Sequence, residues 1–447
     1  MSILRLGAGA GFQGDRIAPA VDLAERGKLH YLIFECLGER TIALAQQARS
    51  IDPTKGYDPL LERRMRAVLP ACVRNGTRIV TNMGAANPHA AAEETRAVAR
   101  ELGLTGLKVA AVMGDDVLDQ IGEFVLDETG NRASALGDRL VSANAYIGID
   151  GLVAALDAGA DVVICGRASD PSLFLAPLVH EFGWARDDWP RLGRGILVGH
   201  LLECAAQITG GYFADPGFKD VPDLANIGHP LAEVDSDGNA VITKLEGTGG
   251  RVSRATCIEQ MLYEIHDPAR YLQPDVIADF SMVNLKEIGP DRVAVTGGTG
   301  TKATGLLKVS VGHRDGWFGE GQISYAGANC VARGKLAISL VRERLAQTSS
   351  SIMEQRGELI GVNSVWPSNT GKDQIPEVRM RYAAHCRDVL SAQSIGEEVE
   401  GLYLAGPAGG GGVTKGVREV LAIASTLMPT AKVATTFEMK EATHEAA

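Results

Sequence analysis

Charged side chains follow directly after short apolar runs at several points in the first half of the sequence. Glu35 follows one such run, Asp115 follows another, and Arg167 and Asp170 follow a third. A carboxyl group whose pKa is raised by burial can act as a general acid or base, and an arginine suits a carboxylate or phosphate on a ligand. We therefore take Glu35 and Asp170 as candidate catalytic groups, and Arg167 and Asp115 as candidate substrate contacts. Helix capping is the alternative role for Asp115 and Asp170.

A glycine-rich turn follows the first apolar run. Gly9, Gly11 and Gly14 have the G-x-G-x-x-G spacing of a dinucleotide-binding turn, and Glu35 ends the next run, where such a site places its ribose-binding acid. Asp15 comes directly after the third glycine, and its negative charge would repel a diphosphate. Asp15 is therefore a further candidate acid or base, or an N-cap. An NAD(P) cofactor held by these glycines is the alternative that the spacing leaves open.

Small polar residues at other turns complete the set of candidate substrate contacts. Asn82 and Ser169 each come shortly after an apolar run, and Thr248, Gly249 and Gly250 form a turn whose backbone N–H groups can hold an anion. A tight turn that contacts no ligand is the alternative for the glycines. Together these groups indicate that the substrate is a small anionic molecule.

The spacing of cysteines and histidines argues against a metal site and against a disulfide framework. The seven cysteines include no C-x-x-C pair, and the nine histidines include no H-E-x-x-H. His200 and Glu203 lie one helical turn apart, which is typical of a surface pair or of a buried, hydrogen-bonded histidine. We expect no metal and no required cofactor.

The first 210 residues alternate apolar runs with amphipathic stretches, which predicts repeated βα units around a mainly parallel sheet with flanking helices. Because the carboxyl ends of parallel strands meet at one edge of a sheet, the polar groups above are expected to lie at that edge. The expected strands are 3–6, 31–34, 78–81, 107–113 and 161–165. The expected helices are 16–26, 40–49, 59–73, 88–102, 150–158 and 196–208.

The residue pattern of the second half of the sequence differs from that of the first half. It predicts a smaller α+β domain with an antiparallel sheet. We expect an α/β domain over residues 1–270, with a hairpin insertion near 231–245, and an α+β domain over residues 271–447. Turn residues and amphipathic spacing then place the later elements. Helices are expected at 254–265, 331–345, 378–390 and 415–427, and a strand at 401–405.

The net charge and the hydropathy of the sequence argue against two classes of binding partner, nucleic acid and membranes. The formal net charge is -11, which disfavours nucleic acid and anionic lipid surfaces. No apolar run reaches the roughly 20 residues of a membrane span, and the first residues do not read as a secretory signal. We expect a cytoplasmic protein that binds neither nucleic acid nor membrane and that forms a homo-oligomer.

Several long strings resemble the acyclic terpene utilisation family typified by AtuA, and the resemblance spans nearly the whole chain. These strings are residues 32–41, 75–88, 148–150, 166–171, 247–250 and 271–276. The resemblance implies a role in the catabolism of acyclic terpenoids, whose intermediates are coenzyme A thioesters of branched acids. It also implies an association with biotin-dependent acyl-CoA carboxylase components. It identifies no catalytic residues.

These observations favour an enzyme of branched acyl-CoA breakdown, with a lyase or hydratase step. Adding or removing water beside a thioester needs an acid, a base and an oxyanion site. Asp15 or Asp170 would act as the acid or base, Arg167 would bind the anion, and the turn 248–250 would supply backbone donors. Two alternatives stay open, which are an NAD(P)-dependent oxidoreductase and a noncatalytic accessory subunit of an acyl-CoA carboxylase system.

Overall fold

The computed structural model describes residues 3–348, 351–366 and 375–443. The chain divides into two units, residues 1–312 with 423–447 and residues 313–422. The boundary expected after residue 270 falls inside the first unit, between α8 (Arg254–Leu262) and β9 (Tyr271–Leu272). The expected fold class is confirmed, because a sheet with a parallel centre and flanking helices forms the N-terminal part and an antiparallel sheet with helices forms the C-terminal part.

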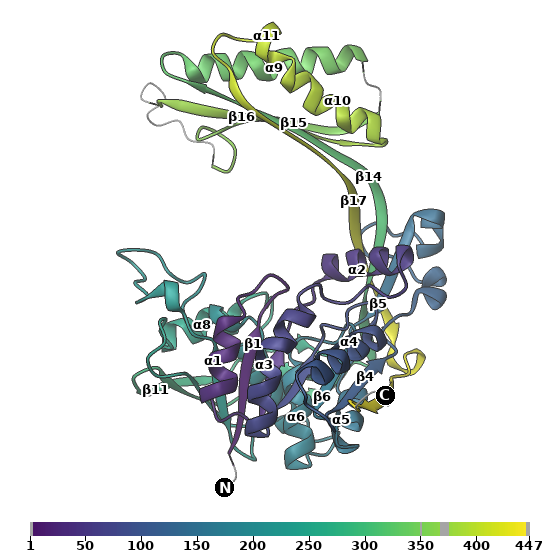
Figure 1. The fold of residues 1–447 in the computed structure, drawn as a ribbon, viewed down its shortest axis with the longest axis vertical. Coiled ribbons are helices and arrows are strands. Elements are labelled where there is room, and N and C mark those ends of the chain that lie inside the picture. The colour runs from purple at the N-terminus through teal and green to yellow at the C-terminus, as the bar shows by residue number, and fades with distance from the viewer. Residues whose placement is uncertain (1–2, 349–350, 367–374, 444–447) are drawn as a thin grey trace. The chain divides into compact units, whose positions relative to one another are not determined.

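The first unit is built on a ten-stranded sheet whose central strands are parallel (Figure 1). These central strands lie in the order β1, β2, β3, β6, β4. Their bounds are β1 Leu4–Ala10, β2 Tyr31–Phe34, β3 Arg78–Thr81, β6 Val162–Cys165 and β4 Lys108–Met113. Each matches an expected strand to within a few residues, because apolar runs this short and this buried are typical of parallel strands.

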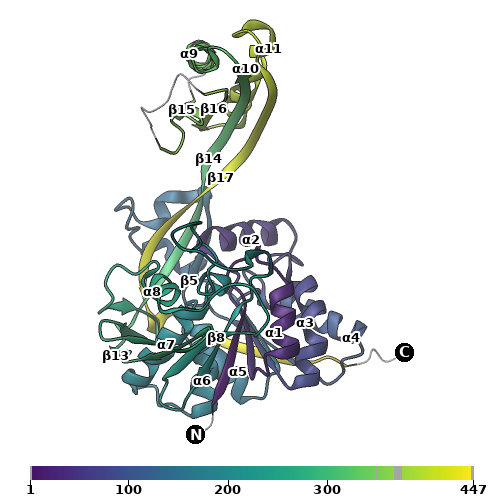
Figure 2. The same cartoon turned by 90° about the vertical axis from the view of Figure 1, so that its left-hand side faces the viewer.

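Helices cover both faces of this sheet, as Figure 2 shows. Side chains of β2 alternate between two cores, with Tyr31 and Ile33 in one and Leu32 and Phe34 in the other. The second core is closed by α1 Ala18–Arg26, α3 Leu61–Asn75 and α4 Pro88–Glu101. The first is closed by α5 Asp150–Asp157, α6 Ser172–Phe182 and α7 Trp189–Leu202.

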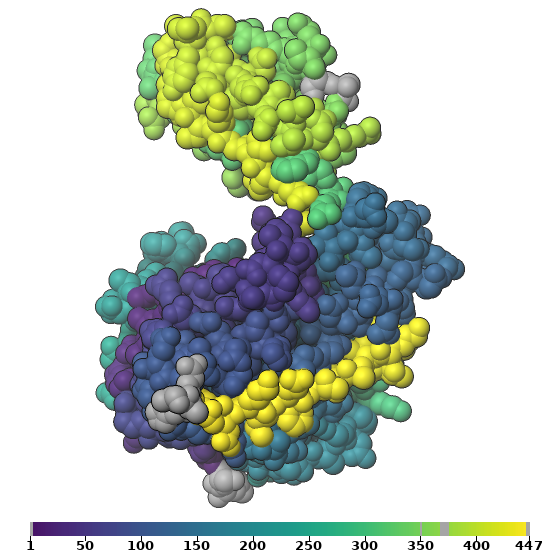
Figure 3. Space-filling model, turned by 45° about the vertical axis from the view of Figure 1, so that its right-hand side comes forward, coloured from purple at the N-terminus to yellow at the C-terminus, as the bar shows by residue number. Residues whose placement is uncertain are grey.

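Antiparallel strands extend the sheet at both edges. The hairpin expected near 231–245 forms, and its first strand pairs with β1. The C-terminal strand β18 (Thr436–Glu441) pairs with β4, and Figure 3 shows this segment in yellow along the surface of the first unit. The added strands at the other edge are β7 Pro230–Val234, β8 Ala240–Lys244, β12 Arg292–Thr296 and β11 Asn284–Gly289. The remaining elements of this unit include α2 Glu39–Ile51, β5 Leu140–Ala145, β10 Val276–Asp279 and β13 Thr299–Lys302.

The second unit has a β-α-β-β-α-β order with its sheet in the sequence β15, β16, β14, β17. This is the split βαβ arrangement, in which two helices pack on one face of an antiparallel sheet. The elements are β14 Leu306–Ala326, α9 Cys330–Thr348, β15 Ile352–Ile360, β16 Glu377–Cys386, α10 Val389–Glu400 and β17 Gly411–Pro429. One apolar core joins α9 and α10 to the sheet. The strand β14 begins in the first unit, and the strand β17 ends in it.

Three of the expected C-terminal elements are wrong. The helix expected at 378–390 is the strand β16 followed by the start of α10, and the helix expected at 415–427 is part of β17. The strand expected at 401–405 is instead the short helix α11 (Leu402–Ala405). In the first part of β16 the buried side chains are every second residue, Val378, Met380 and Tyr382, with the half-buried Arg379 and Arg381 between them, and this is the period of a strand.

Candidate functional site

Four of the candidate residues lie at the carboxyl-terminal edge of the parallel strands, as the sequence predicts. Glu35, Asn82, Asp115 and Arg167 follow β2, β3, β4 and β6, and all four are buried. The Nδ2 group of Asn82 donates to Oε1 of Glu35 at 2.9 Å. The backbone N–H of Arg167 donates to Oδ2 of Asp115 at 2.9 Å. These bonds form two pairs, and because the charge of Arg167 acts on Glu35, the four residues form one electrostatic cluster.

The guanidinium of Arg167 is the centre of this cluster. Its side chain is 2 % exposed, and it stacks on the ring of Tyr146, 4.0 Å from the ring centroid. Its Nη2 donates to Oδ1 of Asp170 at 2.7 Å. Its Nε and Nη1 have no hydrogen-bond partner among the described residues. Because an unpaired buried donor is costly, these two N–H groups are suited to an oxygen of a ligand.

Asp115 positions Arg167. Its Oδ2 accepts from the backbone N–H of Arg167 and from Nδ2 of Asn144, both at 2.9 Å. A Cβ on Gly166 would meet the Asp115 carboxylate at less than van der Waals distance, so this position requires glycine. Burial raises the pKa of Asp115 to about 6. Asp115 therefore holds the backbone that presents the guanidinium, where the sequence suggested a direct substrate contact.

Glu35 is buried within the electrostatic range of Arg167 and Asp170. Its Oε1 accepts from the backbone N–H of Leu37 at 2.8 Å and from Asn82. Burial, and after it the negative charge of Asp170, raise the pKa of Glu35 well above its ordinary value, and they outweigh the positive charge of Arg167. Burial thus favours the neutral form of Glu35, which the sequence offers as a candidate catalytic group.

Asp170 is the ion-pair partner of Arg167. Its side chain is 34 % exposed, and α6 begins without a side-chain cap, so Asp170 does not cap this helix. Burial raises the pKa of Asp170 above its ordinary value, and the charge of Arg167 opposes this. A carboxylate paired with an arginine can act as a base, and a buried carboxyl group whose pKa is raised can act as an acid.

The end of α7 supplies two further buried groups, His200 and Glu203. Nδ1 of His200 lies 2.8 Å from Oε1 of Glu203. Burial lowers the pKa of His200 to about 4, and burial and the charge of Asp170 raise the pKa of Glu203. The spacing of His200 and Glu203 is visible in the sequence. It does not distinguish a functional site from a structural pair whose hydrogen bonds are satisfied. Tyr146 was missed entirely, because it lies in a loop without a motif.

In the first glycine turn, a backbone N–H group is hydrogen-bonded to a side chain of the same turn. The backbone N–H of Gly11 donates to Oδ2 of Asp15 at 3.0 Å, so the anion at this turn is a side chain of the protein. A Cβ on Gly11 would clash with the backbone of Cys204. Burial raises the pKa of Asp15, but His229 and the backbone donors lower it more. Asp15 is thus an ionised partner of His229 and of its own turn, and NAD(P) binding there stays a prediction.

The turn at Thr248, Gly249 and Gly250 also has its amides occupied. The three N–H groups donate to backbone carbonyl oxygens of Leu245, Asn226 and Pro222, at 3.4, 2.8 and 2.8 Å. A Cβ on Gly249 would clash with the carbonyl of Asp223, which explains the glycine. These amides serve the packing of a neighbouring loop and are not free to hold an oxyanion.

Asp275 ties the segment that follows β9 to the loops of the cluster. Its Oδ1 accepts from the backbone N–H of Ile149 at 3.1 Å, and its Oδ2 accepts from Oγ of Ser172 at 3.0 Å. Nearby, the Ser169 hydroxyl donates to Oε1 of Gln273. Ser169, a candidate substrate contact, is therefore engaged by this segment. Asp275 fixes the starts of α5 and α6, which flank Tyr146 and Arg167.

Replacing Asp275 by asparagine should flatten the dependence of the melting temperature on pH between about pH 4 and pH 7. Burial raises the pKa of Asp275 to about 6, from about 3.9 in an unfolded chain. The folded state therefore binds this proton more tightly, so its stabilising effect is complete below about pH 4 and is lost as pH rises through 6. The shift corresponds to about 3 kcal/mol. Scanning calorimetry should show a smaller fall for Asp275→Asn than for the wild type or for the exposed control Asp187→Asn, and equal slopes would contradict the argument.

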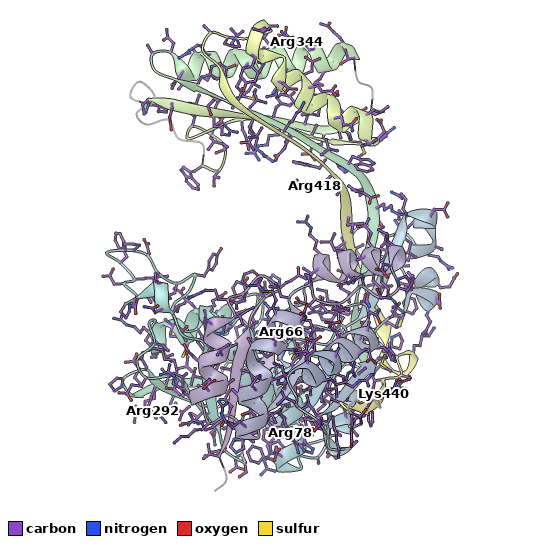
Figure 4. The ribbon with its side chains drawn as sticks, in the orientation of Figure 1. Arg66, Arg78, Arg292, Arg344, Arg418 and Lys440 are labelled. Carbon is purple, nitrogen blue, oxygen red and sulfur yellow. The ribbon has the colours of Figure 1, made fainter. Side chains whose placement is uncertain are left out.

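Polar side chains also lie at the amino-terminal ends of the parallel strands, and they hydrogen-bond to one another. Nη1 of Arg78, labelled in Figure 4, contacts the hydroxyl of Tyr31 at 3.0 Å and Nε2 of His180 at 2.9 Å. An open hollow of about 460 Å³ lies at this edge and is lined by Glu25, Lys28, Leu29, His30, Asn75 and Gly76. It contains no acid-base cluster comparable to the one around Arg167.

Two kinds of feature are absent from the described residues. These residues contain no group of three or more histidine, cysteine, aspartate or glutamate side chains that could hold a metal ion. None of the helices described in the structure is long and apolar enough to cross a bilayer.

Comparison with known proteins gives one match. The family model described as acyclic terpene utilisation family protein AtuA matches residues 4–439. No curated protein and no solved structure matches the chain.

Proposed function

The chain belongs to the acyclic terpene utilisation family AtuA, and on this basis we propose that it is a lyase or hydratase acting on the thioester or free acid of a branched carboxylic acid. The observation that carries the proposal is the buried guanidinium of Arg167, which pairs with Asp170, keeps two N–H groups unpaired and acts electrostatically on the buried Glu35. One charged donor and two carboxyl groups, one as base and one as acid, are the groups that elimination of water beside a carbonyl requires.

Arg167 would bind the carbonyl oxygen of the thioester or the carboxylate of the acid through Nε and Nη1. Negative charge builds up on this oxygen when the neighbouring carbon loses a proton. Donors that are already buried and fixed stabilise such charge more than water does. Stacking on Tyr146 and the bond to Asp170 hold the guanidinium in place before the ligand arrives.

Asp170 and Glu35 would divide the two proton transfers. The Asp170 carboxylate takes the proton from the carbon beside the carbonyl, and the electron pair of that C–H bond forms the C=C bond. The bond from the next carbon to its hydroxyl breaks, and Glu35 gives its proton to the leaving oxygen, which departs as water. Addition of water is the same sequence in reverse. Burial raises the pKa of both carboxyl groups, that of Glu35 well above its ordinary value, and this supports Glu35 as the acid.

The proposal predicts that the purified protein interconverts branched 3-hydroxyacyl-CoA and 2-enoyl-CoA esters without added NAD(P). The reaction is followed by the absorbance of the conjugated thioester and by the mass change of one water. If no thioester is converted, and the protein instead co-purifies with an acyl-CoA carboxylase and raises its activity, the accessory-subunit alternative replaces this proposal.

A further inference from the structure

Tyr146 joins the Arg167 guanidinium to side chains that the proposed mechanism does not use. The guanidinium lies 4.0 Å from the centroid of the Tyr146 ring, and the ammonium group of Lys308 lies 4.9 Å from the same centroid. The Tyr146 hydroxyl donates to Oε1 of Glu39 at 2.5 Å, and Nζ of Lys308 donates to the same oxygen at 3.0 Å. One carboxylate therefore binds both the ring that supports Arg167 and the second cation on that ring.

The backbone fixes Tyr146 between the same partners. Its N–H donates to the carbonyl oxygen of Lys308 at 2.9 Å, and the N–H of the next residue, Ile147, donates to the carbonyl oxygen of Arg167 at 3.2 Å. These bonds tie the backbone of Tyr146 to β14 and to the loop that carries Arg167. They do not set the two side-chain torsions of Tyr146, of which the ring torsion has a broad energy minimum. The orientation of the ring therefore depends on the contacts of the side chain itself.

The bond to Glu39 is the strongest contact of the Tyr146 hydroxyl. A hydrogen bond from a hydroxyl to a carboxylate is about twice as strong as one between neutral groups, and 2.5 Å is at the short end of its range. Oγ of Ser310 also reaches the hydroxyl, but at 3.4 Å. Burial raises the pKa of Glu39, but hydrogen bonds from Tyr146, from the backbone and from Lys308 lower it more, to about 2. Glu39 is therefore ionised at neutral pH, and in this state it holds the hydroxyl most strongly.

The start of α2 holds Glu39 in place. Glu39 is the first residue of this helix, and its carboxylate interacts favourably with the positive end of the helix dipole. The backbone N–H of Gly38 donates to Oγ1 of Thr41 at 2.7 Å, which fixes this end of the helix. The side chains of Lys308 and Glu39 are 45 % and 42 % exposed, so their ion pair contributes little. The helix is thus the main support of the carboxylate, and the lysine is the minor one.

We propose that Glu39 is a positioning residue for Arg167, and that it acts by fixing the Tyr146 ring on which the guanidinium stacks. Asp170 bonds one edge of the guanidinium and Tyr146 covers its face, so a displaced ring leaves the guanidinium held mainly by Asp170. The unpaired Nε and Nη1 groups are then no longer fixed before a ligand binds. The effect on turnover rests on the proposed function, whereas the mobility of the guanidinium can be measured without a substrate.

The first measurement is the rotation of the Arg167 guanidinium about its Cζ–Nε bond, followed by NMR of the whole chain with isotope-labelled arginine. The Arg167 signal is identified by its absence from Arg167→Lys. Glu39→Ala and Tyr146→Phe should each speed this rotation by about 10-fold, because each removes the same charge-assisted hydrogen bond. The double variant should rotate no faster than the single variants, since both act through one bond. A larger effect in the double variant, or an unchanged rate in both single variants, overturns the proposal.

The second measurement is the turnover of a branched 3-hydroxyacyl-CoA. Glu39→Ala should lower kcat by about 10-fold and leave KM nearly unchanged, because misplaced donors weaken the binding of the transition state more than that of the substrate. Glu39→Gln keeps an oxygen that accepts from the Tyr146 hydroxyl but lacks the charge, so it should recover most of kcat. If Glu39→Gln is as impaired as Glu39→Ala, the carboxylate acts on Arg167 through its charge and not through Tyr146, which overturns the proposal.

Glu62 provides a matched control. It lies in the first turn of α3 and pairs with Arg66 at 3.1 Å, as Glu39 begins α2 and pairs with Lys308 at 3.0 Å. Glu62→Ala should change neither the rotation of Arg167 nor turnover, and Lys308→Met should change both less than Glu39→Ala does. An effect as large as that of Glu39→Ala in either variant overturns the proposal. If the wild type converts no thioester, the proposed function fails, and the rotation rates still decide whether Glu39 positions Arg167.

Discussion

Replacing Arg167 by lysine should reduce turnover of a branched 3-hydroxyacyl-CoA by about 100- to 1000-fold. A lysine ammonium can keep the bond to Asp170, but it cannot at the same time stack as a planar group on Tyr146 and present two further N–H groups in the same direction. The donors that would bind the developing oxyanion are therefore lost although the positive charge remains. Steady-state measurement of kcat and KM should place most of the loss in kcat, because these bonds strengthen as the charge develops.

Arg191 provides a matched control for this substitution. It pairs with Asp188 at the same i,i+3 spacing as Arg167 and Asp170, with 3.0 Å between the charged groups, but it is 39 % exposed. Arg191→Lys should leave both the turnover and the melting temperature nearly unchanged, because exposed ion pairs contribute little. If Arg167→Lys keeps wild-type turnover, the guanidinium does not bind the reacting group. If it is too unstable to assay, Tyr146→Leu removes the stacking surface while keeping the guanidinium, and should lower kcat in the same direction.

The position of the cluster was predictable from the sequence, because it depends only on strand polarity. Glu35, Asn82 and Arg167 each follow a short apolar run, and parallel strands bring their carboxyl ends to one edge. The partners that complete the cluster were not predictable in this way. Tyr146 reaches Arg167 from a loop, and its approach depends on how this loop packs on the sheet. The pairs of His200 with Glu203 and of Gln260 with the backbone of His200 likewise depend on how the helices pack.

The glycine turns show where sequence reasoning fails. A glycine permits close approach of another backbone, but the sequence does not say whose backbone it is. At Gly11 it is the backbone of Cys204, and at Gly249 that of Asp223, so both turns contact the protein itself. The boundary between the two units could not be predicted from the sequence for a related reason. β14 and β17 run without interruption from one unit into the other, so no linker composition marks the boundary.

Replacing Asp170 by asparagine should lower turnover by about 100- to 10,000-fold while changing the melting temperature little. The amide oxygen of asparagine can still accept from Nη2 of Arg167, so the arrangement that now has a 2.7 Å bond is kept. What is lost is the carboxylate that takes the proton. The neutral carboxyl group is affected as well, because the charge of Asp170 helps to raise the pKa of Glu35, and without it Glu35 ionises more readily beside Arg167. The variant thus loses its base and weakens its acid together.

The electrostatic coupling between Asp170 and Glu35 also explains why the melting temperature of Asp170→Asn should change little. A buried arginine that loses its counterion normally destabilises a protein strongly. Here a second carboxyl group is in place to take up the negative charge, so the guanidinium stays compensated, and Asp170 makes no cap whose loss would add to the cost. Thermal melting and turnover of Asp170→Asn should be measured beside Asp188→Ala, which removes a helix cap that bonds the backbone N–H of Arg191. Asp188→Ala should change the melting temperature at least as much as Asp170→Asn and should leave turnover intact. The reverse pattern, a large loss of stability in Asp170→Asn with normal turnover, would show that this aspartate serves only to neutralise Arg167.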